Sequence, residues 1–153
     1  LAERGIRVNV DTCGYVPWEN IQRVLPYTDT FLYDIKVMDS DLHREMTGAG
    51  NEEILDNLIK LSESGAAVWI RIPVVGGVND TDRNMKETLE FLSAHSIMPV
   101  WIHLLPYHNT GSGKYPRLGQ EYQGRGFTTP SKERMRELAD MCKKQGFQTE
   151  IGG

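Results

Sequence analysis

The chain has 153 residues, of which 39% are hydrophobic and 25% are charged, and this composition supports one buried core in a single globular domain, 1–153. Its formal net charge is -4 and its basic residues form no block, which argues against nucleic acid or an anionic membrane surface as partner. No apolar run approaches the roughly 20 residues that cross a bilayer, and no signal segment opens the chain. We therefore expect a cytoplasmic protein.

The two cysteines, Cys13 and Cys142, lie far apart in the sequence. This separation predicts neither a disulfide framework nor a CxxC-type metal site, and we interpret both as reduced thiols. The opening residues LAERG are typical of the last turn of a helix that stops at Gly5. We therefore expect a further segment before residue 1.

Short apolar runs rich in branched residues alternate with stretches of helical period, which indicates βα units around a parallel sheet or barrel. The predicted strands are 6–10, 30–35, 67–73 and 98–105, with a short terminal strand at 147–151. The predicted helices are 17–25, 51–65, 81–95 and 131–146, the last two capped by Thr81 and Ser131. The connection 106–130 is longer than ordinary loops, and such loops are usually functional or mobile.

Polar residues gather where these strands end, which is where βα barrels form their active sites. They are Asp11, Thr12, Asp34, Lys36, Arg71 and His108. Asp34 and Lys36 share one face of their strand, roughly 6–7 Å apart, because alternate residues of a strand point the same way. The convergence of four strand ends on one mouth favours a binding site.

Each of these residues also has a purely structural interpretation. Asp34 and Lys36 could form a solvated ion pair worth less than about 1 kcal/mol. Arg71 stands between VWI and IPVV, so its charge must be paired or face a polar cavity, and an interior salt bridge would suffice. His108 alone is more often a loop residue than a catalytic group. A Schiff-base role for Lys36 is disfavoured because Asp34 stabilises the charged ammonium.

Two apparent motifs fail on inspection. The segment GSGK at 111–114 lacks both the first glycine of a phosphate-binding loop, where His108 stands, and its final Ser or Thr, where Tyr115 stands. His103 and His108 match no zinc spacing. Nucleoside triphosphate binding and a protein zinc site are therefore set aside.

Four segments resemble, in order and spacing, the activating enzymes of glycyl radical enzymes, the family of pyruvate formate-lyase activating enzyme within the radical S-adenosyl-L-methionine (SAM) superfamily. They are DTCGYVPWE at 11–19, LYDIKVMDSDLHREMTG at 32–48, VWIRIPVVGGVND at 68–80 and LLPYHNTGSGKY at 104–115. The resemblance implies an α/β fold, a partial TIM-like (β/α) barrel. This chain would supply its C-terminal portion, about four parallel βα units plus a short terminal strand. The forms DTCGY and YDIKxMD are more similar to activators of glycerol, choline or related lyases.

The resemblance implies that the full-length protein activates a glycyl radical enzyme. In this family an electron from a [4Fe–4S] cluster cleaves SAM, and the 5′-deoxyadenosyl radical takes a hydrogen from a glycine of the partner. The implied partners are a glycyl radical enzyme, through its glycine-loop peptide, and a low-potential electron donor such as flavodoxin or ferredoxin.

The CxxxCxxC and glycine-rich GGE segments of this family are not in the sequence, and Cys13 and Cys142 cannot replace three clustered thiolates. The N-terminal cluster-binding part and the iron–sulfur ligands are thus absent. We assign no catalytic residue here and expect the isolated chain to be inactive. The alternative is a non-catalytic SAM- or peptide-binding module.

Position by position, the resemblance implies a set of SAM-binding residues. They are Asp34, Ile35, Lys36, Arg71 and His108. Lys36 would meet the carboxylate of SAM and Asp34 would lie near its ribose. Asp11, Thr12 and Asp34 match a monovalent cation site beside the sulfonium. The loop 106–130 either shapes the groove for the partner's glycine loop or is a surface loop without such a role.

Overall fold

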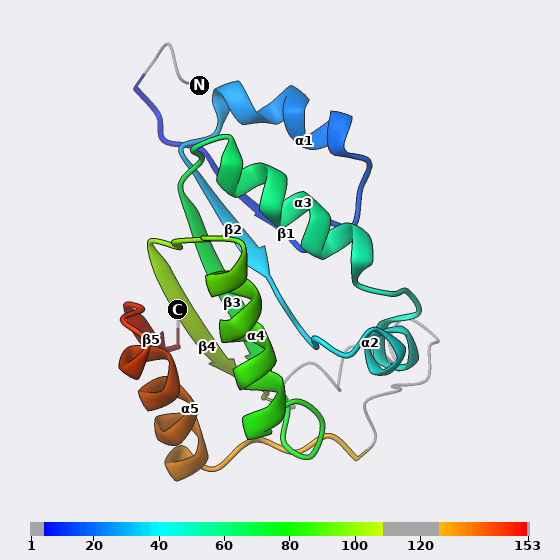
Figure 1. The fold of residues 1–153 in the computed structure, drawn as a ribbon, viewed down its shortest axis with the longest axis vertical. Coiled ribbons are helices and arrows are strands. Elements are labelled where there is room, and N and C mark those ends of the chain that lie inside the picture. Colours follow the sequence, from blue (N-terminus) through cyan, green and yellow to red (C-terminus); the bar gives the residue numbers. More distant parts are fainter. Residues whose placement is uncertain (1–4, 109–125, 153) are drawn as a thin grey trace.

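The computed structural model describes residues 5–108 and 126–152 (Figure 1). Its centre is one sheet of five strands in the order β1-β2-β3-β4-β5, with every neighbouring pair parallel. The strands are β1 (Asn9–Thr12), β2 (Thr30–Asp34), β3 (Val68–Val74), β4 (Trp101–Pro106) and β5 (Thr149–Ile151). The strands lie in the sheet in the same order as in the sequence, as expected when every helical crossover has the same handedness. The predicted α/β class is confirmed.

Helices pack on one side of this sheet (Figure 1). They are α1 (Trp18–Val24) with the short helix η2 (Leu25–Tyr27), α3 (Glu52–Glu63), α4 (Asp82–Ala94) and α5 (Lys132–Lys144). A further helix, α2 (Ser40–Thr47), lies beyond the carboxyl end of β2 (Figure 1). Among the residues that the structure describes, no helix combines the length and apolar character needed to cross a membrane.

The core lies between the sheet and the helices. Along β3 every second side chain is buried, from Val68 to Val74, while Trp69, Arg71 and Pro73 are only partly covered. Because side chains of a strand alternate between faces, these three lie on the side that faces away from the helices, here called the open face. The apolar stripes predicted for α3 and α4 supply the matching core surface, including Leu58 and Leu89.

The strand boundaries differ from the predicted ones mainly at the first strand. Pairing begins with Asn9 opposite Thr30, so the ladder includes Thr12. Val8 lies just before the ladder. Its amide donates to the carboxylate of Asp29 at 2.7 Å, so Val8 is bound to the turn before β2 and does not pair within the strand. The strand predicted at 98–105 begins at Trp101 and ends at Pro106.

The four predicted helices are present, and α2 is an element that the sequence patterns did not predict. Thr81 and Ser131 cap α4 and α5 as expected, accepting from backbone amides at 3.2 and 3.0 Å. In α2, Asp39 accepts from the first-turn amides, and Gly48 ends the helix with a left-handed φ of 89°. Of the long connection predicted at 106–130, residues 109–125 lie outside the described part.

Candidate functional site at the carboxyl ends of the strands

A charged cluster joins three strands on the open face. Arg71 of β3 stands in register with Asp34 of β2, and its Nε and Nη2 lie 2.9 and 2.8 Å from Asp34 Oδ1. Nη2 also donates to the carboxylate of Asp11 from β1. Burial by itself lowers the pKa of the guanidinium, but the hydrogen bonds to Asp34 and Asp11 outweigh this and raise it. The guanidinium of Arg71 is therefore held in place between two carboxyl groups.

The cluster shows which carboxylates pair with which basic side chain. Asp34 pairs with Arg71, and the ion pair between Asp34 and Lys36 is not formed, because the guanidinium of the neighbouring strand reaches the carboxylate directly. Arg71, flanked by buried apolar residues, takes the interior salt bridge. Lys36 lies two residues beyond the end of β2 and is left for other contacts.

Lys36 forms part of the wall of two cavities. One, of about 380 Å³, is also lined by Cys13, Tyr15 and His43, and is called the Cys13–His43 pocket below. The other, of about 280 Å³, reaches Phe127. Within the described residues the ammonium of Lys36 has no hydrogen bond or ion pair. A lysine that faces two cavities without a carboxylate partner is suited to an anionic ligand.

Buried asparagines hold the loops that carry these side chains. Asn57 of α3 donates both amide hydrogens to the loop after β1, to Gly14 O at 2.8 Å and Val16 O at 2.7 Å. Asn51, which precedes α3, does not cap the helix but donates to two carbonyls of the loop after β2, each at 2.8 Å. Each amide thus satisfies two loop carbonyls at once.

A third buried asparagine, Asn79, fixes the backbone of Lys36. Its Nδ2 donates to Lys36 O at 2.6 Å and Pro73 O at 2.7 Å, and its Oδ1 accepts from Val75 N at 2.7 Å. One side chain therefore connects the end of β2 to the end of β3. Asn51, Asn57 and Asn79 are called the asparagine clamps below.

The side chain of Tyr33 packs against the loop after β1. The hydroxyl of Tyr33 donates to Ile54 O at 2.7 Å, and burial raises its pKa. Gly14 lies directly over this hydroxyl, with a φ of 72°, and a Cβ at this position would lie 1.7 Å from the Tyr33 oxygen. Only glycine satisfies both the conformation and the close approach. Cys13, the residue before it, lines the Cys13–His43 pocket.

The remaining predicted residues occupy different places. Thr12 pairs with Tyr33 in the ladder, hence on the helix side, and its hydroxyl accepts from Gly14 N at 2.9 Å. The structure thus does not bring its side chain to the carboxylates of Asp11 and Asp34, and no group of three potential metal-binding side chains occurs in the described residues. Ile35 is 2% exposed and donates its amide to the backbone of β3.

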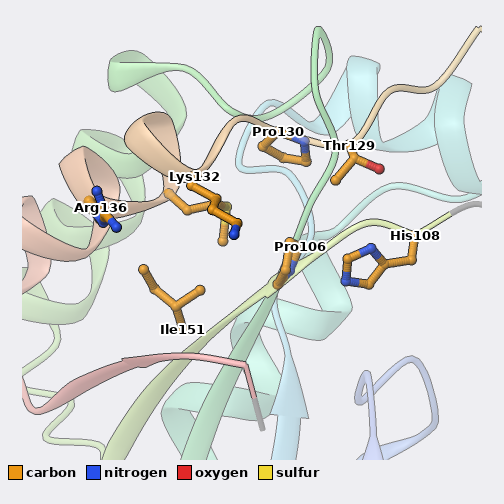
Figure 2. Close-up of a pocket in the computed structure, with 8 residues that line it drawn as sticks. Pro106, His108, Thr129, Pro130, Lys132, Arg136 and Ile151 are labelled. Carbon is orange, nitrogen blue, oxygen red and sulfur yellow. The ribbon is translucent and has the colours of Figure 1, made fainter.

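His108 follows β4 at the same edge of the sheet as Lys36. It lines a separate cavity of about 360 Å³ together with Pro106, Pro130 and Ile151. Figure 2 shows these side chains. Lys36 does not line this cavity. The structure therefore places both residues at the carboxyl ends of the strands, but against different pockets.

Sequence reasoning missed an aromatic group on the open face. His103 stands in register with Arg71 and is 7% exposed, and its ring lies 5.2 Å from that of Trp69 and 6.1 Å from that of Trp101. The segments WIRI and WIHL carry a signal for it, because both place tryptophan and a basic residue two positions apart in a strand.

The two thiols lie on different elements. Cys13 is partly exposed in the loop after β1, whereas Cys142 is buried in α5 with its sulfur 3.5 Å from that of Met85. Burial raises the pKa of Cys142 to about 11. A [4Fe–4S] cluster with one open iron needs three neighbouring thiolates, and the sequence has no third cysteine. The residues of this chain do not fit such a cluster.

Comparison with known proteins identifies the family. Residues 1–92 match the model of the Radical SAM superfamily. Over 98% of its length the chain is 45% identical to "Trans-4-hydroxy-L-proline dehydratase activating enzyme" from Clostridioides difficile, and over 97% it is 37% identical to "Choline trimethylamine-lyase activating enzyme" from Oleidesulfovibrio alaskensis. It covers 50% and 49% of these proteins, so it spans about half the length of the curated relatives it matches.

A solved structure carries the same fold. The crystal structure of a domain of pyruvate-formate lyase-activating enzyme from Bacteroides vulgatus matches 99% of this chain and 84% of that domain, with 31% identity and a TM-score of 0.83. The predicted partial TIM-like arrangement agrees with this likeness. The chain therefore belongs to the radical SAM superfamily and, within it, to the activating enzymes of glycyl radical enzymes.

Proposed function

We propose that this chain is the SAM-orienting C-terminal half of an enzyme that activates a glycyl radical enzyme. The observation that carries the proposal is the Lys36 ammonium at the carboxyl ends of the strands, which has no partner among residues 5–108 and 126–152 and lies at the same strand ends as the cluster of Asp11, Asp34 and Arg71. Asn79 fixes the carbonyl of Lys36, so the ammonium is presented from a rigid backbone.

The roles follow from charge and placement. Lys36 binds the carboxylate of SAM, and Asp34, oriented by Arg71, accepts from the ribose hydroxyls. Ile35 contributes its backbone, because its side chain belongs to the core. His108 lies beside a separate cavity at the same edge of the sheet, and its proposed contact with the ligand would come from there. Asp11, with Asp34 and the backbone near Thr12, attracts a monovalent cation.

SAM, when bound, supplies the 5′-deoxyadenosyl group that removes a hydrogen atom from a glycine of the partner enzyme. The chain's own contribution is to bind and orient SAM and to exclude water around it. The cluster chemistry of the superfamily requires thiolates from outside these residues. The partners proposed for the whole protein are a glycyl radical enzyme and a low-potential donor such as flavodoxin or ferredoxin.

The test is SAM binding to this chain, measured by NMR titration, with Lys36→Ala compared with Lys86→Ala, an exposed lysine of α4. A charge-assisted hydrogen bond contributes about 1.5–3 kcal/mol, so Lys36→Ala should weaken binding at least about tenfold and Lys86→Ala should not. Equal affinity in both variants would refute the role of Lys36.

The rival function is a SAM- or peptide-binding module without catalysis, and the wide separation of Cys13 and Cys142 favours it for these residues taken alone. Both functions predict that this chain alone holds no cluster, and anaerobic reconstitution with iron and sulfide tests that shared expectation. We expect no cluster absorbance and no release of 5′-deoxyadenosine under reduction. Stoichiometric formation of either would show that the thiolate argument is wrong.

A further inference from the structure

His43 has no role in the function proposed above, although it lies within the segment 32–48 that carries the family resemblance. It belongs to α2, is only 3% exposed, and lines the Cys13–His43 pocket together with Lys36. A buried histidine that lines a pocket with an unpaired lysine can contact whatever the lysine binds.

The surroundings of His43 fix which ring nitrogen carries the proton. Nδ1 lies 2.7 Å from the carbonyl oxygen of Ala49. A carbonyl can only accept, so Nδ1 donates, and in the neutral ring Nε2 is then the acceptor. The left-handed turn at Gly48 returns the Ala49 carbonyl to the ring. The Thr47 hydroxyl also lies 3.1 Å from Nδ1, but it donates its proton to the His43 carbonyl at 2.8 Å and so can accept from Nδ1. The tautomer is therefore set by the end of α2 itself.

Nε2 is the free nitrogen of this ring. Among the described residues it has no hydrogen-bond partner, and no fully enclosed polar side-chain atom there lacks one, so Nε2 must be accessible. His43 lines the Cys13–His43 pocket, and we infer that a ligand would meet Nε2 there. The other charged groups near His43, Arg44 and Glu52, already form an ion pair with each other.

The pocket thus offers two complementary groups. The ammonium of Lys36 requires an acceptor and favours a carboxylate, whereas Nε2 of His43 requires a hydrogen-bond donor. The cavity of about 380 Å³ is of the size of a small-molecule site. The ligand that fits is a carboxylate with a neighbouring donor, which is the chemistry of an α-amino acid.

We propose that His43 is a further positioning residue of the SAM site. It accepts, through Nε2, a hydrogen bond from the amino-acid end of SAM, whose carboxylate is held by Lys36. This inference rests on the proposed function, and it adds a second side chain that recognises the same end of the ligand. It also gives the Thr47–Gly48–Ala49 turn a purpose, which is to hold the imidazole in one tautomer.

The test compares two amides at position 43. Asparagine places its amide nitrogen near the position of Nδ1 and keeps the bond to Ala49, whereas glutamine places an amide oxygen near Nε2 and can accept from the ligand. The native chain, His43→Asn and His43→Gln are titrated with SAM and with 5′-methylthioadenosine, which lacks the amino-acid end. Thermal unfolding of each variant reports whether the fold is kept.

We expect His43→Asn to weaken SAM binding about tenfold, the value of one lost hydrogen bond, and to leave 5′-methylthioadenosine within about twofold. His43→Gln should restore most of the SAM affinity. Equal loss for both ligands would mean a structural role only, and unchanged SAM affinity would overturn the proposal. If the native chain binds neither ligand, the proposed function itself fails, and the inference fails with it.

An independent readout uses the thiol in the same pocket. Cys13 is partly exposed whereas Cys142 is fully buried, so iodoacetamide should modify only Cys13 in the folded chain. SAM should slow this alkylation, and 5′-methylthioadenosine should slow it less. Equal protection by both compounds would place the amino-acid end elsewhere and contradict the proposal.

Discussion

Replacement of Asn79 by alanine tests whether the clamp that carries Lys36 stabilises the fold. Asn79 is 4% exposed and makes three hydrogen bonds, to Lys36 O, Pro73 O and Val75 N, with lengths between 2.6 and 2.7 Å. The variant leaves two backbone carbonyls and one amide without this partner. Because Lys36 and Val75 lie just beyond the ends of β2 and β3, the backbone of Lys36 loses its fixed position.

The expected magnitude follows from the number of bonds. A buried hydrogen bond contributes about 1 kcal/mol net, so three predict a loss of about 3 kcal/mol in the free energy of unfolding. Asn84→Ala is the matched control, because Asn84 is 7% exposed and its side chain makes one bond, from Met38 N at 2.9 Å. It should cost about 1 kcal/mol.

Urea denaturation measures both variants against the native chain. With a slope of about 2 kcal/mol/M, Asn79→Ala should lower the midpoint by about 1.5 M and Asn84→Ala by about 0.5 M, with unchanged slopes. Asn79→Ala should also weaken SAM binding, whereas Asn84→Ala should not. A loss for Asn79→Ala no larger than for Asn84→Ala would refute the reasoning from bond number.

Three further predictions concern buried contacts. Gly14→Ala should destabilise the chain by about 2–4 kcal/mol through its backbone strain and its collision with the Tyr33 side chain. A Tyr33→Phe background should relieve only part of this loss, because the ring carbon Cζ would still lie 2.3 Å from the new Cβ, as a double-mutant cycle by urea denaturation will show. Burial raises the pKa of Cys142 to about 11 in the folded chain, whereas the pKa of the thiol in the unfolded chain is about 9. The free energy of unfolding should therefore keep its full value below pH 8 and fall by about 1 kcal/mol from pH 8 to pH 10. Cys142→Ala should remove this part of the slope. Mass spectrometry after iodoacetamide treatment should find the label on Cys13 and none on Cys142 until urea unfolds the chain.

The order of the strands and of the helices α1, α3, α4 and α5 could be predicted because hydrophobic period depends on local residues. In the candidate site, the need of Arg71 for a partner could also be predicted, because a charge between buried apolar residues must be paired. The structure supplies Asp34 and Asp11 as partners. The helix α2 was missed because its one buried residue is polar, His43, so no apolar stripe marks it. Asp39 and Gly48 cap the two ends of α2, but without an apolar stripe between them these two residues did not predict a helix.

The asparagine clamps could not be predicted, because an amide that satisfies two distant carbonyls depends on how elements dock. Asn57 carried a signal nonetheless. It interrupts the apolar stripe of α3 between Ile54 and Leu58, and a polar residue in that position must find a buried partner. The tautomer of His43 depends in the same way on the turn at Gly48, which only the folded chain reveals.

The asparagine clamps also determine how parts of the chain depend on one another. Asn57 reaches Gly14 and Asn79 reaches Lys36, each across 43 residues, which joins one βα unit to the unit before it. A sheet whose units are fastened only to their immediate neighbours behaves thermodynamically like a linear array, in which opening starts at the ends and spreads inward unit by unit. Hydrogen exchange should then protect β3 most and β1 and β5 least, a gradient that a closed ring of strands would not have.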